Sequence, residues 1–326
     1  MNRRWGWFSI MAAALLMVSS TAWANGADDA SDDKVVIGFN NMFTDLEFFQ
    51  VVEEGLVKAA EENGIELLIA YGERDGTKMM RNVETFILQG ADIVLDFNVL
   101  PEVGTQIVKR CAEESIPVIG IDGIYEGAYF FGVNNEKVGR TGGTYAAQYI
   151  KDNWGGDLDY IMQLYSESAG PAVQLRNSGA SDVISEELPG FDPDNVIWVD
   201  GGGHMDTVNG RALTMDFLTA HPEADHIYIQ VLTDLPALGA FNAVQEAGRE
   251  DQVIIISNDA SGPALDNMRK PEANSWLGSV AAFPEKYGEN LVDYALQILE
   301  GGDAPKAKYT DNVVIDKSNI NAYYPE

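Results

Sequence analysis

Short apolar runs alternate with segments of helical periodicity along most of this chain. In the first unit, the apolar run at 35–39 predicts a strand buried on both faces, and after a polar loop Phe48, Val52 and Leu56 recur at helical spacing with Glu and Lys between them. Asp45 stands where its carboxylate could cap this helix. The loop has no glycine-rich or Gly-Lys phosphate-binding pattern, and its carboxylate, amide and aromatic groups suit hydroxyls and sugar rings better.

The same alternation continues to the end of the chain, with units of roughly 30 residues, which is the size of a βαβ unit in a parallel sheet. Two successive runs of such units predict two similar doubly wound α/β lobes rather than one long sheet. The predicted strands are 35–39, 65–71, 93–97, 117–122, 128–133, 159–165, 195–200, 226–231, 252–258, 275–281 and 308–315. The predicted helices are 46–63, 77–89, 101–115, 135–154, 172–187, 206–220, 234–248, 263–270 and 284–300.

Charge narrows the possible ligands. The 326 residues include 51 acidic and 21 basic side chains, a net charge of −30. A nucleic-acid-binding protein needs a basic face, so nucleic acid is excluded as a partner, and anionic ligands and anionic membranes are disfavoured. Acidic residues occur in every segment, which predicts a solvated acidic surface like that of proteins adapted to high salt.

The N-terminus has the pattern of an export signal. A pair of arginines precedes an apolar segment at 8–18, too short to span a bilayer, and an Ala-Trp-Ala motif ends at Ala24. We expect a signal peptide over residues 1–24, cleavage after Ala24, and a soluble protein in a Gram-negative periplasm. The acidic stretch 25–34 is expected to be a disordered start of the mature chain.

The sequence motifs that would indicate an enzyme are weak in this chain. The glycines at 201–203 do not form a dinucleotide loop, because Asp206 stands where the third glycine belongs, and no Gly-x-Ser-x-Gly elbow is present. His221 and His226 lack a third metal ligand at helical spacing. The single cysteine, Cys111, lies on the apolar stripe of a helix and is expected to be a buried hydrophobe. We therefore expect no enzyme activity, no cofactor and no metal.

Aspartates recur at the ends of predicted strands, namely Asp45, Asp96, Asp122, Asp234 and Asp259. The carboxyl ends of parallel strands border the crevice where such sheets bind ligands. One aspartate at such a place is commonly a cap or turn former, but five at equivalent edges favour a binding site. An ionised carboxylate accepts hydrogen bonds only, so it suits the neighbouring hydroxyls of a polyol.

Other side chains would complete this site. Asn41 supplies an amide in the first loop, and Arg176 lies in an equivalent loop of the second half. Phe48 and Phe49 offer an apolar plate for a sugar ring, although core packing is the alternative interpretation for either of them.

Several motifs together resemble one family, the periplasmic sugar-binding proteins of the ribose/galactose type, which share their fold with the ligand-binding part of LacI-type repressors. The resemblance runs from about Lys34 to the C-terminus. The motifs are Val35-Val36-Ile37-Gly38, Phe48-Phe49 with Gly55, Gly90-Ala91-Asp92-Ile93, Ile116-Pro117-Val118, Leu218-Thr219-Ala220-His221-Pro222 and Asp234-x-x-Ala237-Leu238-Gly239-Ala240.

The resemblance implies a hinge between the lobes. The N-terminal lobe would consist of 35–133 plus 283–308, and the C-terminal lobe of 134–282 plus 309–326. Three crossovers would join them, near 132–135, 281–284 and 308–311.

The resemblance also implies ligand contacts residue by residue. The family's aromatic pair falls on Phe48 and Phe49, and its ligand arginine falls on Gln174, with Arg176 close by on the same helix. The remaining family positions fall on Asp45, Asp96, Asp122, Thr233 and Asp259. Ala282 stands where the family has a hinge Gln, so the ligand need not be ribose.

The expected function is delivery of a small neutral sugar or cyclitol to the membrane permease of an ABC importer by hinge closure. A cationic amine is the second ligand class, and a periplasmic enzyme acting on a polyol is the alternative function. A repressor is excluded, because the chain has an export signal and strong acidity instead of a helix-turn-helix and a basic surface. A monomer is expected, and a chemoreceptor is left open as a further partner.

Overall fold

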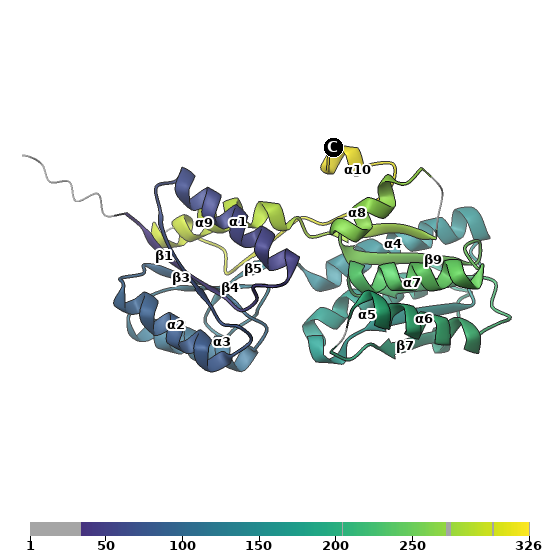
Figure 1. The fold of residues 1–326 in the computed structure, drawn as a ribbon, viewed down its shortest axis with the longest axis horizontal. Helices are drawn as coiled ribbons and strands as arrows, with labels where there is room; N and C mark the ends of the chain where they lie inside the picture. Colours follow the sequence, from purple (N-terminus) through teal and green to yellow (C-terminus); the bar gives the residue numbers. More distant parts are fainter. Residues whose placement is uncertain (1–33, 204, 272–274, 302, 326) are drawn as a thin grey trace, which may run out of the picture. The chain divides into compact units, whose positions relative to one another are not determined.

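The computed structural model describes residues 34–203, 205–271, 275–301 and 303–325 (Figure 1). It confirms the predicted fold class, because the chain forms two α/β lobes, each on a six-stranded, mainly parallel sheet. The predicted signal peptide at 1–24 lies outside the described residues, and so does the acidic stretch 25–34 except for Lys34. No helix in the described ranges is long and apolar enough to cross a membrane.

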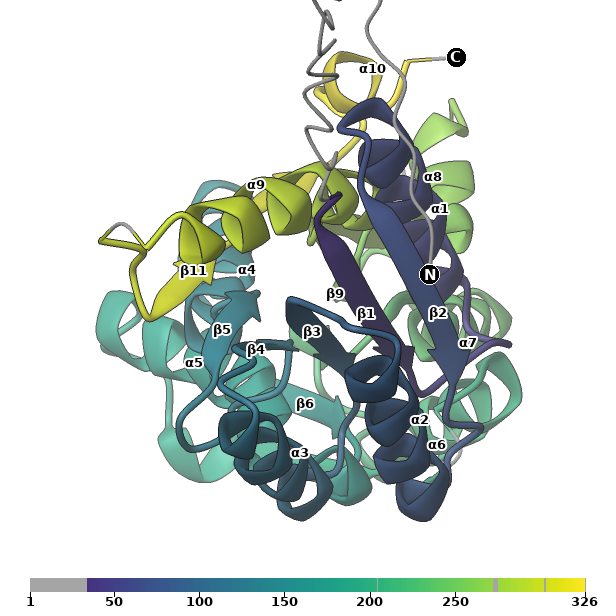
Figure 2. The ribbon, with the colours of Figure 1, turned by 90° about the vertical axis from the view of Figure 1, so that its left-hand side faces the viewer.

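The first sheet has the strand order β11-β5-β4-β3-β1-β2, and all neighbouring strands are parallel. Helices α1 and α9 cover one face, and α2 and α3 cover the other (Figure 2). The central strands are therefore buried on both faces, which explains their unbroken apolar runs. The elements are β1 (Val36–Asn41), α1 (Glu47–Glu62), β2 (Glu66–Tyr71), α2 (Gly76–Leu88), β3 (Ile93–Phe97), α3 (Pro101–Glu113), β4 (Val118–Ile121), β5 (Tyr129–Gly132), α9 (Tyr287–Leu299) and β11 (Ala307–Tyr309).

The second sheet has the order β12-β10-β9-β8-β6-β7, in which only the edge strand β12 is antiparallel to its neighbour among the described strands. Helices α4 and α5 pack on one face, and α6, α7 and α8 pack on the other (Figure 1). The elements are α4 (Asn135–Trp154), β6 (Tyr160–Tyr165), α5 (Pro171–Glu187), β7 (Val196–Asp200), α6 (Thr207–Ala220), β8 (Ile227–Val231), α7 (Asp234–Ala247), β9 (Val253–Asp259), α8 (Gly262–Arg269), β10 (Trp276–Ala281), β12 (Val313–Ile315) and α10 (Ile320–Tyr323).

Three short segments carry the chain from one sheet to the other. They lie between β5 and α4 at 133–134, after β10 at 282–283, and between β11 and β12 at 310–312. The two sheets have the same strand order and differ only in the direction of the edge strand, so β4 of the first sheet is equivalent to β9 of the second. The ends of β4 and β9 are therefore equivalent positions in the two lobes.

Three local predictions differ from the structure. Asp45 does not cap α1, because the residue at the N-cap is Leu46 and Asp45 pairs with Arg74 instead. The predicted strand 308–315 is two strands, one in each sheet, since the chain crosses between them. The predicted helix 284–300 begins as a 3-10 turn, Pro284–Lys286, before α9. By contrast, Cys111 is fully buried in the core beside α2, as predicted.

The contact between α1 and α9 is close enough to forbid a side chain at Gly288. A Cβ atom there would lie 2.0 Å from the carbonyl carbon of Gly55 and 2.3 Å from the backbone nitrogen of Leu56. Backbone atoms cannot move aside as a flexible side chain can. We expect Gly288→Ala to lower the free energy of unfolding by about 3 kcal/mol, measured by urea denaturation.

Gly190→Ala is the matched control, because Gly190 is exposed and a Cβ atom there would meet no heavy atom within 4 Å. Its free energy of unfolding should stay close to that of the unmodified protein. Equal stability of the two variants would show that α1 and α9 are not in close contact.

Candidate functional site

The ends of β4 and β9 carry aspartates in an unusual backbone conformation. Asp122 follows β4 with a φ of 52°, and Asp259 ends β9 with a φ of 102°. Non-glycine residues avoid this region, and such a conformation costs on the order of 1–3 kcal/mol. The strain occurs at equivalent positions of both lobes, and strain of this kind concentrates at ligand-binding sites. These two aspartates are therefore the starting point for the site.

The carboxylate of Asp122 is tied to the crossover segments. Its Oδ1 accepts a hydrogen bond from the backbone N–H of Val133 at 2.9 Å, and its Oδ2 lies 3.2 Å from the hydroxyl of Tyr287, which donates to it. Val133 lies in the first crossover, and Tyr287 comes just after the second. The orientation of the Asp122 side chain is thus set by one crossover and by the first residue of the helix that follows another.

Asp259 is paired with Arg176, a residue of α5. The Nη1 of Arg176 donates to Oδ1 of Asp259 at 3.0 Å, and the Nε of Arg176 donates to Oδ1 of Asn135 at 2.8 Å. The two side chains of the ion pair are only 13% and 20% exposed. The guanidinium is therefore held in place from two directions, at the start of α4 and at the end of β9.

The carboxylates of the site have too little positive charge beside them to offset the effect of burial on their pKa values. Burial raises the pKa of Asp122 to about 6; the Val133 N–H and Arg176 oppose this shift, and Asp259 adds to it. Burial also raises the pKa of Asp259, and again Arg176 opposes the shift. The guanidinium of Arg176 thus acts on both carboxylates, and it does not fully offset their burial.

The aromatic pair of the first loop divides into a core residue and a more accessible one. Phe49 is 9% exposed and stacks on Phe97 with ring centroids 4.0 Å apart. Phe48 is partly buried, and the rings of Phe97 and Tyr287 contact it edge to face, with centroids 6.3 and 5.5 Å away. Phe48 also packs against the apolar core that α4 and α5 form with the second sheet. Of the pair, Phe48 is the better placed to contact a ligand.

Two predicted site residues of the first lobe are engaged inside it. Asp96 is fully buried, accepts hydrogen bonds from the side-chain amides of Asn40 and Asn98, and has its pKa raised to about 7 by burial. Asn41 is fully buried too, and its amide donates to Glu53 at 2.8 Å. Both side chains therefore hold the loops that follow β1 and β3.

Asp45 lies on the surface, where the guanidinium of Arg74 pairs with it at 3.0 Å and lowers its pKa. Arg74 also lies over the ring of Phe43, 4.8 Å from its centroid. The carboxylate of Asp45 is thus already balanced by a cation of its own lobe.

Among the predicted site residues of the second lobe, Asp234 is likewise engaged inside its own lobe. Asp234 is 1% exposed and accepts hydrogen bonds from Ser257 at 2.6 Å, Ser279 at 2.7 Å and the backbone N–H of Ser261 at 2.7 Å. Burial raises the pKa of Asp234 to about 7, and the nearby charge of Asp259 contributes. Asp234 therefore anchors the loop that follows β9.

Thr233 is partly buried at the N-cap position of α7, where its side chain makes no capping bond. Gln174 is also partly buried, and its amide donates to the carbonyl of Glu167 at 3.4 Å. Each of these side chains keeps hydrogen-bonding capacity for a ligand.

Sequence reasoning missed two residues, Tyr287 and Asn135. Tyr287 is fully buried and lies 165 positions from its partner Asp122, while Asn135 lies 41 positions from Arg176. No local pattern encodes pairs so far apart. The resemblance did place a crossover at 132–135, which was the available signal for Asn135.

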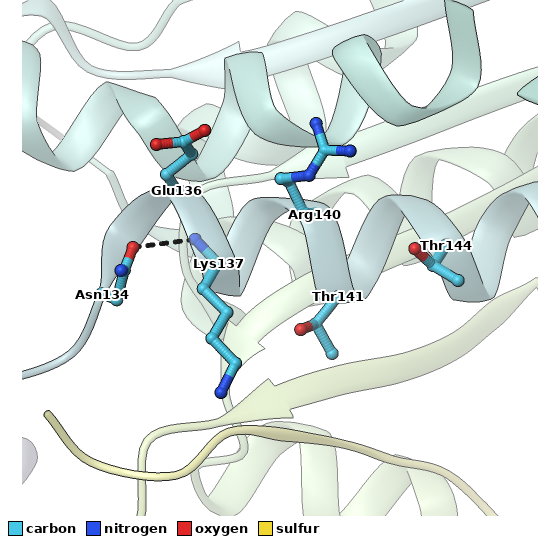
Figure 3. A pocket seen from close by; sticks show the side chains of 6 residues that line it. All are labelled: Asn134, Glu136, Lys137, Arg140, Thr141 and Thr144. Atoms are coloured by element: carbon cyan, nitrogen blue, oxygen red, sulfur yellow. Dashed lines mark hydrogen bonds between the residues drawn. The ribbon is translucent and has the colours of Figure 1, made fainter. Parts of the chain in front are cut away.

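A surface pocket lies along the first turns of α4, with a volume of about 390 Å³ (Figure 3). Asn134, in the first crossover, caps α4 by accepting from the backbone N–H of Lys137 at 3.0 Å. Thr141 donates to Asn312 of the third crossover at 2.8 Å. The pocket borders the crossovers, and none of the predicted ligand residues lines it. Its lining residues are Asn134, Glu136, Lys137, Arg140, Thr141 and Thr144.

The described residues hold no cluster of three or more His, Cys, Asp or Glu side chains that could bind a metal ion. The thiol of Cys111 is buried, and its pKa is raised to about 12 mainly by that burial. A thiol in that state is a poor nucleophile. The groups at the ends of β4 and β9 can instead accept and donate hydrogen bonds, and Phe48 adds an apolar surface.

Two equivalent α/β lobes with polar groups at their carboxyl edges define a class of ligand-binding protein. Residues 37–303 match the periplasmic binding protein domain, and the chain belongs to that family. This membership implies a periplasmic location. The family is one of transporter substrate-binding proteins rather than enzymes.

Individual relatives agree with this assignment. The chain is 24% identical to the ribose import binding protein of Bacillus subtilis over 285 residues, which cover 87% of this chain and 88% of the relative. Among solved structures, the periplasmic ribose ABC transporter protein of Conexibacter woesei superposes with a TM-score of 0.76 at 22% identity, covering 90% of this chain and 95% of the other. A solute-binding protein of Bacillus halodurans with bound myo-inositol has a TM-score of 0.72 at 23% identity, covering 89% and 97%.

Proposed function

We propose that this protein captures a small sugar or cyclitol in the periplasm and delivers it to the membrane permease of an ABC importer. The observation that carries the proposal is the equivalent pair Asp122 and Asp259, strained in backbone and placed at the carboxyl edge of each sheet. The family assignment supports it, since its named members include ribose and myo-inositol binders. The signal peptide would direct export and would be cleaved after Ala24.

Each lobe contributes part of the ligand contacts in this proposal. Asp122 and Phe48 act from the first lobe, and Arg176, Thr233 and Asp259 act from the second. The carboxylates accept ligand hydroxyls, Arg176 donates, and Phe48 covers the C–H face of the ring. Asp96, Asn41, Phe49 and Asp234 support the loops from inside the lobes, Asp45 pairs with Arg74 on the surface, and Gln174 offers a further hydrogen-bonding group to the ligand.

A ligand that touches both lobes binds the closed form more tightly and therefore shifts the population toward closure. The three crossovers serve as the hinge. Asp122 is bonded to Val133 of one crossover and to Tyr287 just beyond another, so ligand contact and hinge geometry meet at one carboxylate. An affinity near micromolar, about −8 kcal/mol, suffices for capture and still permits release.

Two measurements test the proposal. A thermal-shift screen over sugars and cyclitols should find a ligand that raises the melting temperature, and small-angle scattering at saturation should then show a smaller radius of gyration. Turnover of that ligand by the purified protein would favour the enzyme alternative. An unchanged radius of gyration, for a free protein that is not already closed, would contradict hinge closure.

A further inference from the structure

Two carboxylates of the site, Asp122 and Asp259, share one guanidinium among the described site residues, that of Arg176, which lies 3.0 Å from Asp259. The charge of Asp259 also adds to the raised pKa of Asp122 and of Asp234, so Asp259 interacts with each of them. Arg176 is the cation that opposes the shifts of Asp122 and Asp259. The position where the resemblance implies the family's ligand arginine is Gln174, which is neutral, so Arg176 is the cation on this helix near the site. With Asp122 and Asp259 both ionised, the arrangement carries one net negative charge.

This excess of negative charge distinguishes between the two ligand classes that the sequence left open, a neutral sugar or cyclitol and a cationic amine. A neutral polyol satisfies carboxylate lone pairs with its hydroxyls, but closure around it must either bury the excess negative charge or protonate one carboxyl group, and both oppose binding at neutral pH. An ammonium group donates up to three hydrogen bonds and also supplies the missing positive charge.

The aromatic wall of the site fits a cation as well. The ring of Tyr287 contacts Phe48 at 5.5 Å between centroids, and the hydroxyl of the same tyrosine donates to Asp122. Phe48 is thereby fixed on the same side of the site as the carboxylate of Asp122. An ammonium bound to this carboxylate can interact with the face of a neighbouring aromatic ring, which strengthens its binding.

We infer that the ligand is an amino-substituted polyol, such as an amino sugar or an aminocyclitol, whose ammonium group is bound between Asp122 and Asp259 beside Phe48. This inference rests on the proposed function, because it names the chemical class of ligand for the same site. Arg176 remains paired with Asp259 and donates to ligand hydroxyls. The remaining hydroxyls of the ligand are read by Thr233 and Gln174.

Matched ligands test the inference directly. The panel consists of glucose, galactose, mannose and myo-inositol, each beside its monoamino analogue and the N-acetylated form of that analogue, with affinity measured by isothermal titration calorimetry. In at least one set, the amine should bind at least tenfold more tightly than the hydroxyl parent, and N-acetylation, which removes the charge, should abolish the gain.

Variants separate charge from shape. Asp122→Asn and Asp259→Asn should each lower the ratio of amine affinity to parent affinity by tenfold or more, whereas Asp216→Asn, on the exposed face of α6, should leave this ratio unchanged. A structural defect alone would weaken both ligands equally and leave the ratio intact.

The results of these titrations test the ligand class and the proposed function separately. Binding of neutral parents as tight as or tighter than that of their amines, in every set that binds, would overturn the charge inference and leave the proposed function standing. Absence of binding by every compound at millimolar concentration would overturn both.

Discussion

Asp259→Ala is expected to weaken ligand binding by about 2–4 kcal/mol, or roughly 30- to 1,000-fold. The carboxylate of Asp259 is partly buried, and its charge acts on Asp122 of the other lobe. Its removal leaves ligand donors without an acceptor in the closed, dry site, and Arg176 loses its partner. Isothermal titration calorimetry with the ligand from the screen measures the loss, and Asp122→Ala should behave alike.

Asp216→Ala serves as the control, because this aspartate is exposed on α6. Circular dichroism and the melting temperature establish that each variant is folded before its affinity is compared. A folded Asp259→Ala protein with unchanged affinity would identify Asp259 as a turn former and remove it from the site.

Arg176→Met should lower the free energy of unfolding by about 2 kcal/mol at pH 8 and by less at pH 5. Removal of one partner of a partly buried ion pair leaves the other charge uncompensated. Without the guanidinium, the pKa values of Asp122 and Asp259 rise further above that of an unfolded aspartate, so the folded state holds protons that the unfolded state releases. The free energy of unfolding then falls as pH rises through this range, and the deficit is largest above the folded pKa values.

Denaturant titration at pH 5, 6.5 and 8 measures this dependence. Arg211→Met is the matched control, since Arg211 forms an ion pair with Glu246 in which both side chains are about half exposed. Exposed pairs contribute about 0–1 kcal/mol, so this variant should show little loss and no added pH slope. A pH-independent deficit in Arg176→Met would show that the residue acts through packing alone.

The fold was predictable because its signals are local. Apolar runs and helical periodicity predicted β3 and α4 to the residue, at 93–97 and 135–154. A buried parallel strand needs an unbroken apolar run, and a helix on a sheet needs one apolar stripe, whatever the rest of the molecule does. The sequence prediction missed the break between β11 and β12, because β11 ends where the chain crosses to the other sheet.

The site was predictable only as a set of strand-end residues. Strand-end position does not tell whether an aspartate faces solvent or core, because that depends on groups brought from elsewhere in the chain. Burial of Asp96 is tolerated because Asn40 of a neighbouring strand donates to it, and burial of Asp234 is tolerated because Ser257 and Ser279 donate to it. Residues 23 to 56 positions apart make these contacts, beyond the reach of any local pattern.

The last strands have a consequence for biosynthesis. Residues 307–309 add a strand to the first sheet, and residues 313–315 add one to the second. The first lobe cannot complete its sheet before residue 309 has been made, and the second cannot do so before residue 315, although domains otherwise fold in turn during synthesis. The nascent chain therefore has no finished lobe until the first of these two strands is available. For the same reason, no single cut in the backbone yields two complete lobes.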